Sequence, residues 1–307
     1  MLVKVKVIDV LIWTMPVHFR PVRPGPSLKK ALDRFYREYN FRERLSHDPI
    51  EFPHRYSGPE DIEIAGFIAS CFAYGKVGLF KPVIEKVLAP CGRHPARFFK
   101  NFTLKSDGKY FEDISYRFNK GKDVLCLAYM LNRALNEWGS LKKLFYYCYN
   151  PSMSRHEDTG PALAEFVKYF LNIDTSPVYG RDIRPYGLKQ FFPSPENGSA
   201  CKRMNLFLRW MVRTGDIDLG VWDNIPPSKL IIPLDTHILK ISGCLGLTGR
   251  KTSDWKTAKE ITGSLKKFDP EDPLKYDFAL CHHGISRLCR GKKFKDVCSS
   301  CAFSSPR

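Results

Sequence analysis

The chain has 307 residues, with 49 lysines and arginines against 32 aspartates and glutamates, which gives a formal net charge of +17. This length buries a hydrophobic core without disulfides and excludes a small disulfide-stabilised scaffold. Hydrophobic residues make up 43% of the chain and aromatic residues 13%, so it is not a disordered basic tail. An excess of positive charge on a folded protein indicates a polyanionic partner, although charge that serves only solubility is the alternative.

The predicted elements begin after an irregular arm. Four prolines interrupt residues 1–26, and Ser27 then lies where it can cap a helix over residues 28–40. Pro59 opens a second helix that runs to residue 76. Apolar faces with helical period follow over residues 79–90, 123–139, 141–150, 160–173, 202–215, 236–247, 254–268 and 275–289. No run of alternating strands is present, so the sequence predicts an all-α protein of about ten helices.

Two polar loops, residues 191–203 and 215–235, lie between strong helices and are rich in turn residues. Long loops of this kind in compact domains are often functional. The second loop brings Asp235 to the start of the helix over residues 236–247, where an aspartate can serve simply as an N-cap. The rings of Trp210, Trp222, Phe191 and Phe192 border the loops and could hold an extruded base. Core packing is the alternative for each ring, and it explains Trp222 least well.

The ten cysteines divide into scattered and clustered ones. The chain has no apolar stretch approaching the roughly 18–20 residues of a membrane span, and no signal-peptide cleavage site follows its start. We therefore expect a cytoplasmic protein without membrane association, in which scattered cysteines are core residues and clustered ones indicate a metal. The clustered cysteines are Cys281, Cys289, Cys298 and Cys301.

The order of these parts resembles the helix-hairpin-helix base-excision DNA glycosylases of the endonuclease III type. The resemblance is carried by LDTHILKISGCLGL, KTAKEITGSLKKF, HHGISRLC and the terminal CxxC. Through DPIEFPHRY, KRMNLFLRW, IIPLDTHI and DPEDPLKYDFAL, the chain is more closely similar to an uncharacterised bacterial branch of that superfamily, described only as a domain of unknown function. The resemblance implies a two-lobed fold with a C-terminal cysteine-cluster loop. Its parts would be an arm over residues 1–26, a barrel-like helical domain with the hairpin over residues 64–232, and a second helical domain over residues 27–63 plus 233–307.

The resemblance also implies catalytic residues. The aspartate at the head of the helix in a V-D-T-H pattern matches Asp235, whose carboxylate would stabilise the oxocarbenium charge that develops when an N-glycosidic bond breaks. In bifunctional members a lysine follows the hairpin in a K-T-A-N-like run, which Lys202-Arg203-Met204-Asn205 resembles. Lys202 would attack C1′ and form a Schiff base, whereas a phosphate contact is its alternative role. The insert between Lys202 and Asp235 is similar in length to that of the archaeal 8-oxoguanine glycosylases, which makes an oxidised purine the candidate lesion.

The chain departs from the family pattern in the hairpin and in the cysteine cluster. The hairpin L-P-G-V-G is replaced by PENGSA, in which only Gly198 remains. Cys289, Cys298 and Cys301 match the iron–sulfur ligands, and Cys281, or a histidine beside it, would have to be the fourth. We expect a [4Fe–4S] cluster, with zinc or an empty site as the alternatives.

The function expected from the resemblance is excision of a damaged base from duplex DNA by a monomeric, nucleoid-associated glycosylase, with or without β-elimination lyase activity. A non-catalytic nucleic-acid-binding protein on the same scaffold is the main alternative. An enzyme that acts on RNA bases or nucleosides also stays open. The residues expected to contact DNA are Gly198, Ser199, Arg203, Lys240, Arg250, Lys251, Arg290, Lys292 and Lys293.

Overall fold

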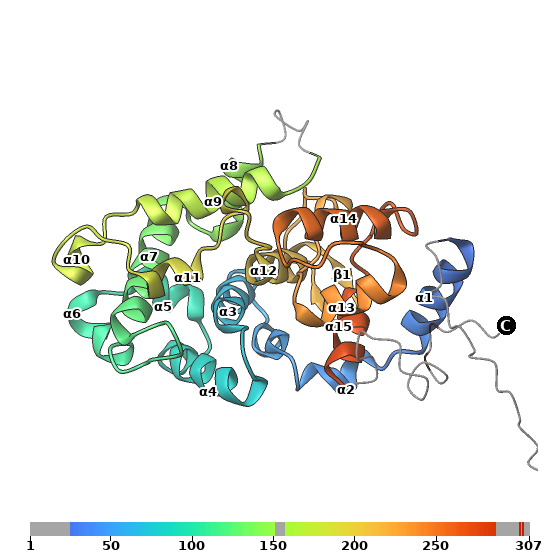
Figure 1. The fold of residues 1–307 in the computed structure, drawn as a ribbon. Coiled ribbons are helices and arrows are strands. Elements are labelled where there is room, and N and C mark those ends of the chain that lie inside the picture. Colours follow the sequence, from blue (N-terminus) through green and yellow to red (C-terminus); the bar gives the residue numbers. More distant parts are fainter. Residues whose placement is uncertain (1–24, 151–156, 287–300, 302, 304–307) are drawn as a thin grey trace, which may run out of the picture.

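The computed structural model describes residues 25–150, 157–286, 301 and 303, and within them the protein is built almost entirely of helices (Figure 1). This confirms the predicted all-α class. The described strands, β1 (Thr214–Gly215) and β2 (Asp218–Leu219), pair antiparallel with Thr214 opposite Leu219. The sequence did not predict this hairpin in the second polar loop, because a two-residue strand has no period to detect.

The helices expected from hydrophobic period are all present, although some ends differ. Their bounds are α1 (Pro26–Glu38), α3 (Pro59–Phe72), α4 (Val77–Leu88), α7 (Gly121–Trp138), α8 (Leu141–Tyr149), α9 (Gly160–Asn172), α12 (Lys202–Val212), α13 (Thr236–Leu245), α14 (Trp255–Lys266) and α15 (Asp277–Ile285). The predicted cap at Ser27 is wrong. Gly25 is the N-cap and Pro26 occupies the first turn, where its missing N–H costs nothing.

Shorter elements connect these helices and were not predicted, because one or two turns are too short to show a period. They are the α-helices α2 (Phe41–Leu45), α5 (Pro95–Asn101), α6 (Leu104–Asp107), α10 (Ser176–Tyr179) and α11 (Tyr186–Phe191). The 3₁₀ turns are η1 (Pro49–Glu51), η2 (Pro53–Arg55), η3 (Ala89–Cys91), η4 (Gly108–Tyr110), η6 (Pro195–Asn197) and η7 (Pro227–Lys229).

Helices α3 and α12 form the centre of the fold. Residues Ile62–Phe72 of α3 are buried on every side, and α3 packs against α12. In Figure 1 the helices α4–α11 lie on one side of this central pair, and α1, α2 and α13–α15 lie on the other. One continuous cluster of buried apolar side chains runs through both groups. The domain boundaries predicted at residues 64 and 232 stay a prediction.

The starts of α13 and α12 each have a distinctive residue directly before the helix. Asp235 is the N-cap of α13, and its side chain accepts hydrogen bonds from the first turn. Cys201 precedes α12 with φ of +48°, a left-handed conformation that is strained for a cysteine. Of the helices in the described part of the chain, none is both long enough and apolar enough to cross a membrane.

Candidate active site

A cavity of about 350 Å³ lies between the two groups of helices. Its walls come from the α2–η1 and α3–α4 connections, from α12, from the start of α13 and from α15. The volume is at the lower end of the range of about 300–1,000 Å³ found for small-molecule sites. The polar residues that line it are His47, Asp48, Lys76, Lys202, Arg209, Asp235, His237, Asp277 and Cys281.

Asp235 uses its two carboxylate oxygens differently. Oδ1 accepts hydrogen bonds from the backbone N–H groups of His237 and Ile238, both at 2.8 Å, and so caps α13. Oδ2 lies on the cavity side, 3.9 Å from the Nζ atom of Lys202. The cap holds the carboxylate in a fixed orientation while leaving one oxygen to the cavity.

Lys202 is the first residue of α12, directly after the strained Cys201. Its Nζ atom donates a hydrogen bond to the Ala73 carbonyl at 3.3 Å, in addition to its ion pair with Asp235. A lysine at this end of a helix faces the positive end of the helix dipole, so helix stability does not explain its position. The structure therefore brings together the two residues singled out as catalytic, and no comparison tests their roles.

Cys281 on α15 is the third polar residue in contact with this pair. Its Sγ atom donates a hydrogen bond to Asp235 Oδ2 at 3.6 Å. Burial raises the pKa of the Cys281 thiol well above its ordinary value, and the Asp235 and Asp277 carboxylates raise it further. Gly284 permits this arrangement, because a Cβ atom there would lie 2.8 Å from the Cβ atom of His237 on α13.

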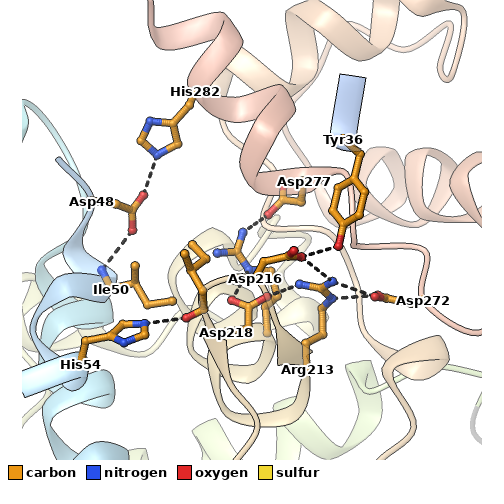
Figure 2. Close-up of polar contacts among 12 residues, drawn as sticks. Tyr36, Asp48, Ile50, His54, Arg213, Asp216, Asp218, Asp272, Asp277 and His282 are labelled. Atoms are coloured by element: carbon orange, nitrogen blue, oxygen red, sulfur yellow. Dashed lines mark hydrogen bonds and ion pairs between the residues drawn. The ribbon is translucent and has the colours of Figure 1, made fainter. Parts of the chain in front are cut away.

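Beneath the cavity lies a network of buried charges that the sequence did not predict (Figure 2). Arg209 of α12 donates to Asp277 and, at 3.2 Å, to Asp218 of the β1–β2 hairpin. Arg213 binds Asp218 as well, and it forms a two-pronged ion pair with Asp272 at 2.8 and 2.7 Å. Two arginines one helical turn apart thus tie α12 to the hairpin and to the start of α15.

Two further contacts extend this network to the N-terminal segments (Figure 2). Asp48 accepts a hydrogen bond from the Ile50 N–H at 3.0 Å and lies 3.1 Å from Nε2 of His282. His54 donates from Nε2 to the Ile217 carbonyl at 2.6 Å. Sequence patterns could not identify Asp48 as a cavity residue, because its burial depends on the packing of α15 against η1.

The cavity residues Arg209 and Asp277 are each 2% exposed as side chains. Burial raises the pKa of Asp277 to about 6, although Arg209 lowers it. Among the described residues, neither Nη2 of Arg209 nor Oδ1 of Asp277 has a hydrogen-bond partner. Perturbed carboxyl groups and unmatched polar atoms of this kind concentrate at functional sites.

The residues expected to contact DNA differ in their surroundings. Arg203 is engaged inside the fold, because its guanidinium donates to the carbonyls of Cys71 and Gln190 and lies 4.9 Å above the Tyr74 ring. It therefore holds α12 against α3, which is a different role from the expected phosphate contact. Gly198 is exposed at φ of +72° in the turn after η6. The carbonyl of this glycine accepts a hydrogen bond from the Trp255 N–H at 3.0 Å.

The remaining candidates for DNA contact lie on α13 and around the start of α14, or outside the described residues. Lys240 and Lys251 are exposed. Arg250 contacts Thr257 and Asp254, the N-cap of α14. Ser199 pairs with Asp254 through the backbone. Arg290, Lys292 and Lys293 lie outside the described residues.

The rings that border the polar loops are core residues. Trp210, Phe191 and Phe192 are buried, and so is Trp222, which is 2% exposed. Nε1 of Trp222 donates to Glu63 on α3 at 2.9 Å. The expectation that Trp222 is hard to explain as a core residue is therefore wrong, because the hairpin folds the insert back onto α3.

The described residues include two of the four clustered cysteines. Cys281 lies at the cavity, Cys301 is half-buried, and Cys289 and Cys298 lie outside the described residues. Within the described part of the chain, no group of three or more histidines, cysteines or carboxylates could hold a metal ion. The hydrogen bond of Cys281 to Asp235 argues against its assignment as the fourth ligand.

A protein-family model described as "Protein of unknown function (DUF2400)" matches residues 48–286. The chain belongs to the DUF2400 family. No curated protein and no solved structure matches it. The matched segment of this DUF2400 protein contains the candidate pair and every cavity-lining residue except His47.

The family match overturns the expected membership of the helix-hairpin-helix glycosylase superfamily. The residues that suggested it have local explanations in this DUF2400 chain. Asp235 in the LDTHI segment caps α13. Gly198 in the PENGSA segment satisfies the left-handed conformation after a 3₁₀ turn. Short motifs of this kind arise in helical proteins from capping requirements alone.

Proposed function

We propose that this protein is a DNA N-glycosylase that removes a damaged base from duplex DNA. The observation that carries the proposal is the approach of Lys202 Nζ to Asp235 Oδ2, at 3.9 Å, in a cavity of about 350 Å³. Breaking an N-glycosidic bond develops positive charge on the sugar, which a neighbouring carboxylate stabilises. An amine beside that carboxylate can add to C1′ once it has lost a proton.

The pair supports two variants of the reaction. In both, the C1′–N bond breaks, the base leaves with the bonding electrons and takes up a proton, and Asp235 stabilises the charge on the sugar. If Lys202 is the nucleophile, its Nζ atom passes a proton to Asp235 and bonds to C1′, which leads to an imine and to lyase activity. If water is the nucleophile, Asp235 accepts the proton of the water instead.

The charge of the chain supports a polyanionic partner. The formal charge is +17, and exposed lysines such as Lys76, Lys240 and Lys251 lie at or near the elements that form the cavity. Phosphate contacts by such residues position a duplex without specifying its sequence. We further propose that the protein acts as a monomer on nucleoid DNA in the cytoplasm. The groups of helices on either side of α3 and α12 would then be the two lobes of a glycosylase-like fold.

Borohydride trapping on duplex oligonucleotides tests the proposal, with substrates that carry an abasic site or an oxidised purine. We expect a covalent adduct with wild-type protein and none with Lys202→Arg, which keeps the positive charge. Asp235→Asn should still fold and bind the duplex, because asparagine retains the N-cap. It should not release the base, because it lacks the carboxylate that stabilises the charge on the sugar. Asp254→Asn, which alters the N-cap of α14, is the matched control and should stay active. Wild-type protein that neither traps nor releases any damaged base would contradict the proposal.

A non-catalytic nucleic-acid-binding protein is the second candidate function. It is favoured by the contacts of Asp235, because Oδ1 caps α13 and Oδ2 accepts a hydrogen bond from Cys281. The fold alone thus accounts for this carboxylate. This candidate function predicts salt-dependent binding that is the same in wild-type protein and in Asp235→Asn, and no base release from any duplex.

We retain the [4Fe–4S] cluster as part of the proposal, with zinc as its alternative. The placement of Cys289, Cys298 and Cys301 indicates a metal site, and the preference for an iron–sulfur cluster over zinc comes from the resemblance alone. The cluster would stabilise the C-terminal basic segment and takes no part in the chemistry above. Cys281 is left out of the ligand set because its Sγ atom contacts Asp235.

A further inference from the structure

A tight turn beside the cavity presents an arginine and a phenylalanine at its tip. Tyr116 and Asn119 pair through two backbone hydrogen bonds, each 2.9 Å long, which leaves Arg117 and Phe118 as the two residues of the turn. Arg117 has φ of +51°, as two-residue hairpin turns require. A non-glycine residue held in this conformation needs support from the surrounding structure.

That support comes from α3 and α11. The Tyr74 hydroxyl, just after α3, donates to the Tyr116 carbonyl at 3.1 Å and to Asn119 Oδ1 at 2.5 Å. The Tyr116 hydroxyl donates back to the Tyr74 carbonyl. Asn119 Nδ2 donates to the Gly187 carbonyl in α11 at 2.6 Å. The turn is therefore fixed from two sides.

The anchoring brings two exposed aromatic rings together. Phe118 is 47% exposed and Tyr186 is 63% exposed, and their ring centroids lie 5.6 Å apart with the planes at 87°. Gly187 makes this approach possible, because a Cβ atom there would lie 2.5 Å from the Phe118 carbonyl oxygen. Two large rings held rigidly at the surface offer an apolar face to a partner.

The charged side chains next to the pair in sequence are cations, whereas the nearby Asp123 carboxylate is buried behind Gly187 and accepts a hydrogen bond from Tyr179. Every charged residue in the segments 114–122 and 183–192 is a lysine or an arginine. The guanidinium of Arg117 lies 5.8 Å from the centroid of the Phe118 ring, and Lys120, Lys122 and Lys189 are exposed. Aromatic rings flanked by cations suit a polyanion with flat apolar groups, which is the chemistry of a nucleic-acid strand.

The turn adjoins the candidate active site. Gly75 lines the cavity, and a Cβ atom on it would lie 2.8 Å from Nη1 of Arg117 and 2.7 Å from the Tyr116 hydroxyl. A strand that places one base in the cavity would therefore pass Arg117 within a short distance. Phe118 follows Arg117 in the turn, and its ring contacts the Tyr186 ring.

We propose that Phe118 and Tyr186 form a stacking platform for an unstacked base of the DNA strand that enters the cavity. Arg117, Lys120 and Lys189 contact the phosphates of that strand. The platform rests on the proposed function, because it requires a nucleic-acid strand at the cavity. The platform also predicts that the protein binds DNA with unpaired bases near the lesion more tightly than fully paired DNA.

Fluorescence anisotropy with labelled oligonucleotides tests the platform, comparing a single strand, a fully paired duplex and a duplex with two unpaired bases beside an abasic site. We expect Phe118→Ala/Tyr186→Ala to bind the single strand and the partly unpaired duplex at least tenfold more weakly than wild-type protein. Phe118→Leu/Tyr186→Leu should show most of this loss, because leucine keeps apolar area but has no ring to stack. Tyr110→Ala and Tyr147→Ala, which remove exposed tyrosines elsewhere, should bind as wild type.

A second measurement places 2-aminopurine next to the abasic site. Its fluorescence should be quenched by wild-type protein and not by the double alanine variant, whose fold is checked by thermal denaturation. Unchanged binding by the alanine variant, or wild-type binding by the leucine variant, overturns the platform and leaves the proposed function standing. Wild-type protein that binds none of the three oligonucleotides overturns both.

Discussion

Glu63 makes the stability of the protein depend on pH. The side chain is 2% exposed in the centre of α3 and accepts hydrogen bonds from the Leu141 and Lys142 N–H groups, both at 2.7 Å, and from Trp222. Burial raises the pKa of Glu63 from its ordinary value of 4.5 to about 7, although these hydrogen bonds lower it. Between those two values the folded protein holds a proton that the unfolded chain has released.

The contribution of Glu63 to the free energy of unfolding therefore falls as the pH rises. The contribution of Glu63 is fully present below pH 4.5 and is lost as the pH passes about 7. At about 1.4 kcal/mol for each pKa unit, the difference between 4.5 and about 7 amounts to about 3 kcal/mol. Between pH 4.5 and about 7, the contribution of Glu63 to the free energy of unfolding falls by up to about 1.4 kcal/mol per pH unit.

Urea denaturation at a series of pH values between 4.5 and 8 measures this slope. Glu63→Gln cannot ionise, so the difference between wild-type protein and this variant isolates the contribution of Glu63. Glu60→Gln, an exposed glutamate one turn earlier on α3, is the control and should keep the wild-type slope. A Glu63→Gln variant with the same slope as wild-type protein would refute the reasoning.

Three further predictions concern the candidate site and the C-terminal cysteines. Arg209→Leu leaves two buried aspartates without their arginine and should lower the free energy of unfolding by about 3–5 kcal/mol in urea denaturation; a loss below 1 kcal/mol would mean that these carboxyl groups are neutral. Asp235→Ala removes the cap of α13 and should cost about 1 kcal/mol, whereas Asp235→Asn should cost little; equal thermal stability of both variants would refute the capping role. Cys301→Ser should lose bound iron and the visible absorbance of a cluster while Cys281→Ser keeps both, and the reverse result would make Cys281 a ligand.

Hydrophobic period and capping residues predicted the long helices. The helix that begins at Thr236 follows a capping aspartate, and the one that begins at Pro59 has a proline in its first turn. The resemblance to the glycosylases selected Lys202 and Asp235 as catalytic residues, and the structure places both at one cavity. Capping is local, so the start of α13 at Asp235 was visible in the sequence, whereas the catalytic roles of the two residues stay predictions.

The charged floor of the cavity was not predictable in the same way. Arg209 lies in an ordinary helical pattern, and only the packing of α15 and the hairpin against α12 buries it with Asp277 and Asp218. Phe118 and Tyr186 are 68 residues apart along the chain and meet because Asn119 binds the Gly187 carbonyl. Contacts between distant segments leave no periodic signal in the sequence.

The cavity draws its walls from His47, near the start of the described chain, and from Ile285, near its end. During synthesis, α15 is the last of the described helices to leave the ribosome, so the site stays incomplete until nearly the whole chain has been made. A fragment that ends before α15 lacks Cys281 and Asp277 and exposes the aspartate at the head of α13. Chains that end before α15 should therefore lack the activity proposed above, because part of the cavity lining is missing from them.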